Sequence, residues 1–420
     1  MLDVDFGAPE SPDAHSETTY LSRAPFVSLI QSYVEEALGD GPGIDPSHPD
    51  SLWAKIVHSV HEAALSAEHA VEHLLHKEPG SFGPDDPDWH VYIAKGVLDR
   101  LLDGTHPFNT KPAEFDNLAD DARLVVVGDW ATGLPNALHV AERMRDAIQE
   151  ALDRSQQVHV IHLGDIYYAG LESEDRRRFL DCWPVTPDQA DAVYSWCING
   201  NHDMYSGGHG YFTVVLADKR FAHQQDVDGK PTSYFRLRSA SWDFIGLDTA
   251  WNDDITSHGR VADLPDPQSE YVARVAGESD RKLVLFSHHQ LASAYEPDDI
   301  GTKLPAQLDT VLAQEGIKAW WWGHEHRAIT YKPLAGVQYP RCLGNGGVPT
   351  PANEPDPPNP LPGDNIYLHP DATWRSERTY EASGQEIHMF GFAVLDLHPD
   401  GIDVAYVDHD GDVAHTERIQ

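Results

Sequence analysis

The hydrophobic positions in the first part of the chain recur at helical spacing. From Leu52 to His76, apolar residues return every three or four positions, which predicts a long amphipathic helix. The breaker stretch Pro79–Pro87 separates it from Val91–Leu102, where the helical period resumes. The pattern therefore predicts a helical hairpin, with residues 21–38 as a third helix, in an N-terminal helical region that begins with a polar tail and comprises residues 1–119.

From about residue 120 the pattern changes to short runs of β-forming residues separated by longer connections. Continuous apolar runs such as Leu124–Val127 are typical of central strands that are covered on both faces. The Pro-rich, acidic stretch Pro349–Gly363 is expected to be a surface loop. The alternation predicts an α/β domain over residues 120–420. The predicted strands are Leu124–Val127, Val158–Leu163, Ser195–Ile198, Trp242–Leu247, Leu283–Phe286, Ile317–Trp322, Phe390–Leu397 and Ile402–Val407.

Composition and charge narrow the possible partners. The 420 residues include 30 Lys and Arg against 68 Asp and Glu, so the formal charge is 30 − 68 = −38. Such a charge repels nucleic-acid backbones and anionic membranes. Three Cys are too few for a disulfide framework, and no apolar run has the length of a membrane span. The N-terminus is acidic where a signal peptide is basic and then apolar, so we expect a cytoplasmic protein.

Five of the predicted strands are followed by residues that commonly bind metals. In open α/β sheets, functional groups gather beyond the carboxyl ends of strands, so clusters at five such ends can converge in space. One cluster alone is weak evidence, whereas five with carboxylate, amide and imidazole groups form a strong signal. The clusters are Gly128-Asp129-Trp130, Gly164-Asp165-Ile166-Tyr167-Tyr168, Asn199-Gly200-Asn201-His202-Asp203, Ser287-His288-His289 and Gly323-His324-Glu325-His326.

The order and spelling of these clusters resemble the motifs of the calcineurin-like metallophosphoesterases. Those motifs run D-x-H, G-D-x-x, G-N-H-[DE], a late His after an apolar strand, and G-H-x-H. The resemblance covers roughly residues 120–410 and implies a sandwich of two mixed β-sheets flanked by helices. Within the family the chain is similar to the purple acid phosphatases, because Ala131 stands where the first motif has His and Tyr168 follows Asp165 by three residues. In that branch a phenolate replaces the missing imidazole.

By this resemblance, Asp165 bridges two metal ions. Carboxylate and phenolate oxygens at the first ion suit Fe(III), whereas two imidazoles and an amide at the second suit Fe(II), Zn(II) or Mn(II). The resemblance also implies that His202 protonates the leaving oxygen and that Asp203 orients the His202 ring. The implied ligands are Asp129, Asp165, Tyr168 and His326 for the first ion, and Asp165, Asn201, His288 and His324 for the second.

The implied activity is hydrolysis of phosphomonoesters by in-line attack of a metal-bound hydroxide, with a phosphate-ester small molecule as substrate. Two metal ions activate water, hold the phosphoryl oxygens and offset the repulsion from a strongly acidic chain. The motifs do not distinguish this activity from that of a phosphodiesterase or nucleotide hydrolase. A catalytically silent scaffold is a third interpretation, against which the complete ligand set with His202 argues.

Three residues beside the motifs receive more modest interpretations. Tyr167 is expected to pack, because the family spacing selects Tyr168 as the ligand. His289 either lines the substrate cleft or has an ordinary supporting or surface role. Asp248 ends another predicted strand and is expected to be structural.

Overall fold

The computed structural model describes residues 87–112, 115–253, 262–293, 303–353, 370–382 and 384–420. The chain divides into two units between Gly104 and Thr105. In the first unit the structure describes helix α3 (Pro87–Asp103), which confirms the helix predicted at Val91–Leu102. The predicted helices at 52–76 and 21–38 and most of the predicted loop Pro349–Gly363 lie outside the described residues.

In the second unit, six strands form a mixed sheet in the order β16-β15-β14-β2-β3-β4. The central strands β2 and β3 are fully buried, as their continuous apolar runs predicted. β2, β3 and β4 pair in parallel, whereas β14, β15 and β16 pair antiparallel. The strands are β2 (Arg123–Val127), β3 (Val158–His162), β4 (Val193–Cys197), β14 (Gly391–His398), β15 (Gly401–Asp408) and β16 (Val413–Ile419).

Eight strands form a second mixed sheet, in the order β1-β5-β6-β7-β8-β10-β9-β11. β6, β7, β8 and β10 are parallel to one another. β5 pairs antiparallel with β6 and parallel with β1, and β9 pairs antiparallel with both β10 and β11. A separate hairpin consists of β12 (Thr379–Ala382) and β13 (Gln385–His388). The strands of the large sheet are β1 (Asp116–Asn117), β5 (Phe235–Arg238), β6 (Trp242–Gly246), β7 (Lys282–Ser287), β8 (Ile317–Trp322), β9 (Ala328–Tyr331), β10 (Val337–Leu343) and β11 (Ala372–Arg375).

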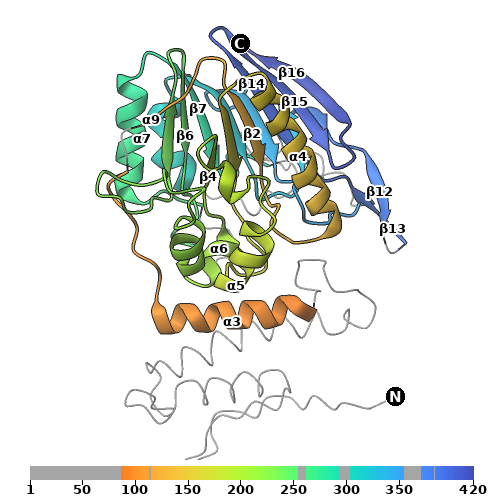
Figure 1. Ribbon diagram of the computed structural model, residues 1–420. Helices are drawn as coiled ribbons and strands as arrows, with labels where there is room; N and C mark the ends of the chain where they lie inside the picture. The colour runs from red at the N-terminus through yellow and green to blue at the C-terminus, as the bar shows by residue number, and fades with distance from the viewer. Residues whose placement is uncertain (1–86, 113–114, 254–261, 294–302, 354–369, 383) are drawn as a thin grey trace, which may run out of the picture. The chain divides into compact units, whose positions relative to one another are not determined.

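The two sheets pack face to face over an apolar core. Val126 of one sheet and Phe244 and Trp321 of the other belong to this core and are fully buried. Helix α4 (Pro135–Asp153) covers the outer face of the six-stranded sheet (Figure 1). α7 (Asp266–Glu278), α8 (Lys303–Gln307) and α9 (Asp309–Leu312) cover the outer face of the eight-stranded sheet. The predicted fold class, two mixed sheets flanked by helices, is confirmed.

Short helices lie in the connections on either side of β4. Between β3 and β4 these are α5 (Glu172–Glu174), the π-helix η1 (Asp175–Leu180) and η2 (Pro187–Gln189). After β4 they are α6 (Asn201–Tyr205) and the π-helix η3 (Tyr211–Val215). Cys182, Cys197 and Cys342 are free thiols. Among the described residues, no helix combines the length and the hydropathy needed to span a bilayer.

Candidate functional site

The ends of five strands carry side chains that meet across the two sheets. β2, β3 and β4 are parallel in one sheet, and β7 and β8 are parallel in the other, so each set has its carboxyl ends at one edge. The turn after β4 leads directly into α6, which lies at one end of the sandwich (Figure 1). His288, after β7, contacts Asn201, after β4, and His326, after β8, contacts Tyr167, after β3.

Four residues of these turns have left-handed backbone conformations, which non-glycine residues rarely adopt. Such conformations cost of order 1 kcal/mol or more each and cluster at functional sites, where surrounding contacts maintain them. The φ angles are 55° at Asp129, 72° at Asp165, 69° at His324 and 51° at His326.

Asp129, Asp165 and His326 form the first of two groups of potential metal ligands, with ligand atoms within 4.8 Å of one another. The hydroxyl of Tyr167 contacts all three residues. It donates to Asp129 Oδ1 or Asp165 Oδ2, each 3.0 Å away, and lies 2.9 Å from His326 Nε2. Two carboxylates, a phenol and an imidazole form a donor set that suits a hard cation.

The structure places Tyr167, rather than Tyr168, where the sequence predicted a phenol ligand. The Tyr168 ring packs against the Arg178 guanidinium, whose Cζ lies 4.8 Å from the ring centroid. The backbone N–H of Tyr168 donates to the Glu174 carboxylate, and its carbonyl accepts a bond from His202. These contacts fix Tyr168 beside the ligand group, whereas Tyr167, which we expected only to pack, contacts the predicted ligands.

The second group comprises His288, His289 and His324, and Asn201 adjoins it through His288. Nε2 of His288 lies 2.9 Å from Asn201 Oδ1 and 3.2 Å from His324 Nδ1. Nδ1 of His288 donates to the Leu163 carbonyl at 2.9 Å, and Asn201 Nδ2 donates to the Tyr205 hydroxyl. His288 Nε2 and Asn201 Oδ1 therefore face each other as two acceptors. A cation held by both atoms would remove this repulsion.

Asp165 lies between the two groups. Its Oδ2 faces the Tyr167 hydroxyl of the first group, and its Oδ1 lies 3.4 Å from His288 Nε2 of the second. Oδ1 also accepts the backbone N–H of His202 at 3.0 Å. One carboxylate that faces both groups has the placement that a bridging ligand requires.

The imidazoles of the site favour the neutral form, which is the form that binds metals. Burial, and then the neighbouring imidazoles, lower the pKa of His288 and of His324 well below the usual value. Burial lowers the pKa of His326 to about 3.

The pKa of the Tyr167 phenol shifts in the opposite direction to the pKa values of these histidines. Burial raises its pKa well above the usual value, and the charges of Asp129 and Asp165 raise it further. Without a cation, the phenol therefore keeps its proton. A strong Lewis acid that contacts the phenol oxygen would reverse this preference.

His202 and Asp203 lie in α6, next to the ligands. Nδ1 of His202 donates to the Tyr168 carbonyl at 2.6 Å, and Nε2 lies 3.8 Å from Asp165 Oδ2. The carboxylate of Asp203 accepts the backbone N–H groups of Gly200 at 2.6 Å and of Asp165 at 3.0 Å. We expected Asp203 to orient the His202 ring, but the hydrogen bond that orients this ring is the one to the Tyr168 carbonyl. Asp203 instead binds the backbone of the turns that carry the ligands.

His289 is a buried member of the second group, with a ligand atom within 4.8 Å of those of His288 and His324. Its Nδ1 lies 3.1 Å from Thr249 Oγ1, and its Nε2 lies 3.0 Å from Asp253 Oδ2. Sequence reasoning missed Thr249 and Asp253, because no ligand motif marks the turn after β6. Asp248 has the expected structural role, accepting backbone N–H groups of that turn.

At two positions the backbone passes so close to a ligand carboxylate that only glycine fits. A Cβ at Gly200 would lie 2.0 Å from Asp165 Oδ1, and a Cβ at Gly323 would lie 2.5 Å from Asp129 Oδ2. Any larger residue at either position displaces a potential ligand.

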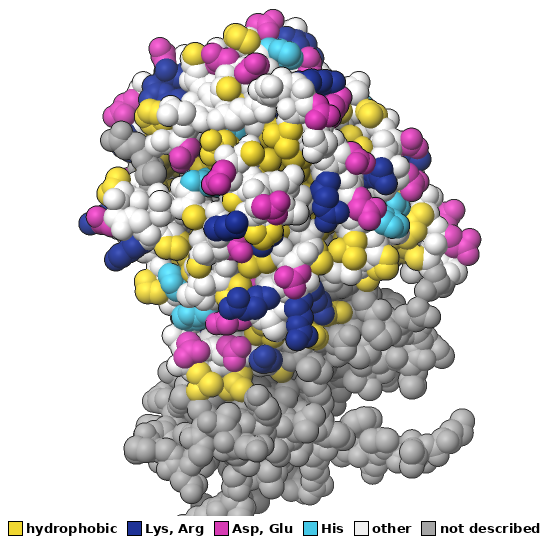
Figure 2. All heavy atoms as spheres, in the orientation of Figure 1, with side chains coloured by type: hydrophobic (Ala, Val, Ile, Leu, Met, Phe, Trp, Pro, Cys, Tyr) yellow, Lys and Arg dark blue, Asp and Glu magenta, His cyan; other side chains and the backbone are white. Residues whose placement is uncertain are grey.

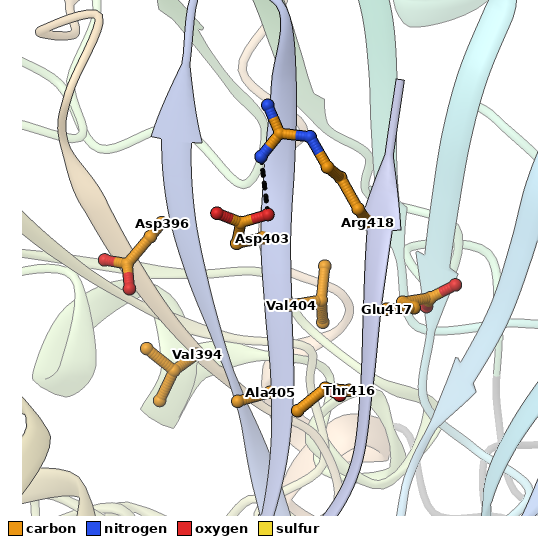
Figure 3. A pocket seen from close by; sticks show the side chains of 8 residues that line it. All are labelled: Val394, Asp396, Asp403, Val404, Ala405, Thr416, Glu417 and Arg418. Carbon is orange, nitrogen blue, oxygen red and sulfur yellow. Dashed lines mark hydrogen bonds and ion pairs between the residues drawn. The ribbon is translucent and has the colours of Figure 1, made fainter.

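A hollow of about 430 Å³ lies elsewhere, on β14, β15 and β16 (Figure 3). Its charged side chains already have partners: Arg418 pairs with Asp403, and Glu417 pairs with Arg341. The hollow contains none of the predicted site residues. Its lining residues are Val394, Asp396, Asp403, Val404, Ala405, Thr416, Glu417 and Arg418.

The fold and the convergent ligands define an α/β sandwich with a candidate metal centre. Residues 122–328 match the family model of the calcineurin-like phosphoesterases. The calcineurin-like phosphoesterase domain that the motifs predicted is therefore confirmed over residues 122–328. Comparison with curated proteins gives no match.

Several solved structures resemble the chain at low identity. The anchor protein of the inner membrane complex of Plasmodium is 13% identical, with 71% of this chain and 89% of that chain covered and a TM-score of 0.45. A predicted phosphoesterase of Streptococcus pneumoniae is 11% identical, with 71% and 97% covered and a TM-score of 0.28. A cold-active protein-tyrosine phosphatase of a Shewanella species is 13% identical, with 76% and 87% covered and a TM-score of 0.30.

Proposed function

We propose that the domain is a dinuclear metal-dependent hydrolase that cleaves phosphomonoesters of small molecules. The observation that carries this proposal is the pair of ligand groups on either side of Asp165, in which lone pairs of His288 and Asn201 face each other at 2.9 Å. Buried acceptors that face each other lack a donor, and a bound ion is one partner that satisfies both.

The two groups fit different metal ions. Asp129, Asp165, Tyr167 and His326 would hold an ion that favours oxygen, for which we expect Fe(III). Asn201, His288, His324 and Asp165 would hold Fe(II), Zn(II) or Mn(II). Such a pair supplies Lewis acidity and clamps the attacking and leaving oxygens of an in-line displacement.

The chain's own residues supply orientation and a proton. The Tyr168 carbonyl holds Nδ1 of His202, so Nε2 faces the Asp165 side of the site. From there Nε2 can deliver a proton to the leaving oxygen of the ester. Asp203 binds the backbone N–H groups of Gly200 and Asp165, which keeps the two turns in register with His202.

The test compares His326→Asn with His398→Asn. His326 belongs to the first ligand group, whereas His398 lies at the end of β14 and pairs with Asp403 at 3.0 Å. We expect His326→Asn to lower kcat/KM for p-nitrophenyl phosphate by more than about 100-fold, the upper limit for residues that only support ligands. His398→Asn should retain the wild-type rate. Metal content per chain, measured on the same samples, should fall in His326→Asn alone.

The same assay separates the rival functions. Faster turnover of bis-p-nitrophenyl phosphate than of the monoester would indicate a phosphodiesterase. A metal-replete wild-type chain that is inactive on a broad panel of phosphate esters and nucleotides would instead indicate a scaffold, and the proposed hydrolysis would be abandoned.

A further inference from the structure

The segment from Tyr167 to Leu171 connects the two chemically important ends of the site. The Tyr167 side chain enters the first ligand group, where its hydroxyl contacts His326. The next residue, Tyr168, holds Nδ1 of His202 with its carbonyl oxygen. The path of this one segment therefore sets both the phenol and the ring of the proposed proton donor.

A buried carboxylate fixes the path of this segment. The Glu174 side chain is only 2% exposed. It accepts the backbone N–H groups of Tyr168, of Ala169 at 3.0 Å and of Leu171 at 3.2 Å. Three donors on one carboxylate leave the segment little freedom to shift, because each displacement would strand a buried polar group.

Arg178 holds the same segment from its other side. Its Nη1 donates to the Tyr167 carbonyl at 3.0 Å and lies 3.8 Å from Glu174 Oε1. Its guanidinium packs against the Tyr168 ring. Arg178 thus contacts both tyrosines as well as the carboxylate that holds the backbone between them.

A second Glu–Arg pair in the same short region is exposed to solvent. Glu172 and Arg176 have the same spacing of four residues and approach to 3.7 Å, but their side chains are 62% and 61% exposed. The exposed pair therefore provides a matched control for the buried pair.

We propose that Glu174 and Arg178 are positioning residues, which hold the Tyr167 hydroxyl and the His202 ring in place at the metal centre. This inference rests on the proposed function for its role in catalysis. Its structural part, control of the phenol, can be measured by metal binding without any turnover.

The experiment titrates the full-length chain with Zn²⁺, used as a probe because the carboxylate and imidazole ligands of both groups can bind it, and records the near-ultraviolet difference absorbance of tyrosine. Tyr167→Phe identifies the part of the signal that belongs to the Tyr167 phenol. In Glu174→Gln and Arg178→Met, the apparent Zn²⁺ affinity from this signal should fall by about 10- to 100-fold, as is typical for groups that orient metal ligands. Glu172→Gln and Arg176→Met should keep the wild-type affinity. Arg178→Lys, which keeps a donor near the Tyr167 carbonyl, should lie between wild type and Arg178→Met.

Folding of each variant is checked by circular dichroism. Should Glu174→Gln fail to fold, Arg178→Met carries the test, because the Arg178 side chain is 22% exposed and Glu174 keeps its three backbone donors. Wild-type affinity in folded Arg178→Met would overturn the inference, as would a wild-type Zn²⁺ signal that survives Tyr167→Phe.

Hydrolysis assays on the same samples separate this inference from the proposed function. An inactive wild type whose Tyr167 signal depends on Glu174 and Arg178 would remove the function and leave the positioning role. An active wild type whose Zn²⁺ affinity is unchanged in Glu174→Gln and Arg178→Met would support the proposed function and remove the positioning role.

Discussion

Tyr167 and Tyr168 are neighbours in sequence, but their rings have opposite chemical surroundings. Tyr167 presents its hydroxyl to two carboxylates and an imidazole. Tyr168 presents its ring to the Arg178 guanidinium, a cation that favours contact with an aromatic face. Both side chains are almost completely buried, so exposure alone does not distinguish them.

This difference predicts which tyrosine colours the iron-loaded protein. A phenolate bound to Fe(III) produces a visible charge-transfer band, and Tyr167 is the phenol that reaches the ligand group. We expect Tyr167→Phe to abolish the band and Tyr168→Phe to retain it, as measured by the visible spectrum of protein reconstituted with iron. Loss of the band in Tyr168→Phe alone would restore the spacing inferred from the family motif and contradict the structure.

The sequence was informative about residue types at strand ends, but not about which side chain each turn presents. The motif spacing selected Tyr168, and the choice depends on how Glu174 and Arg178 hold the backbone, which no spacing encodes. Asp203 was expected to orient His202 as its chain neighbour, yet its carboxylate faces the backbone of Gly200 and Asp165. These differences arise from side chain–backbone contacts, which fix the path of each turn and which residue spacing does not reveal.

At the scale of elements, a buried ion pair joins the two sheets. Arg341 of β10 binds Glu417 of β16 through two hydrogen bonds of 2.7 and 2.5 Å. The side chains are only 4% and 15% exposed. Arg341 also donates to the carbonyls of Tyr331 and Pro340, so its charge is fully engaged within the protein.

Removal of one partner of this pair should be costly. Glu417→Ala leaves the Arg341 charge buried without its carboxylate, so we expect the free energy of unfolding to fall by about 3–5 kcal/mol. The exposed pair Arg274–Glu278 gives the comparison, since Glu278→Ala should cost less than about 1 kcal/mol. Denaturant unfolding measures both values. Equal small effects for the two variants would show that the inter-sheet pair contributes little.

Strands with strong apolar runs were predictable, and those without them were not. All eight predicted strands are present, with boundaries that differ by at most two residues. β10 was missed because Pro340 argues against a strand interior. Its pairing with β9 is confined to residues 341–343, so Pro340 lies beyond that pairing. β16 was missed because it is an edge strand in which Ile419 alone is buried.

For the whole molecule, the acidic excess of −38 opposes the approach of any phosphate ester. On the face shown in Figure 2, Lys and Arg side chains are interspersed with Asp and Glu, and hydrophobic side chains are scattered. Cations at the metal centre would therefore supply the local positive potential that the chain as a whole lacks.

Buried histidines couple the stability of the whole molecule to pH. His162 of β3 is fully buried against Trp130, Phe179 and Trp183, and burial lowers its pKa to about 3. In the unfolded chain the imidazole has an ordinary pKa of about 6.5. Between these two values the unfolded state binds a proton that the folded state does not. The contribution of His162 to stability is therefore complete above about pH 6.5 and is lost progressively as the pH falls toward 3.

The change His162→Phe should remove this pH dependence while filling a similar volume. Between pH 7.5 and pH 5.5, His162 alone should cost wild type about 1.4 kcal/mol of unfolding free energy. We therefore expect the loss over this range to be smaller in His162→Phe by that amount, as measured by denaturant unfolding with a metal chelator present. His398→Phe, whose side chain is 43% exposed at the end of β14, is the control and should follow the wild-type pH dependence. Parallel pH profiles for wild type and His162→Phe would mean that the buried imidazole takes up its proton without unfolding, which requires water or a polar partner to reach it between Trp130 and Trp183.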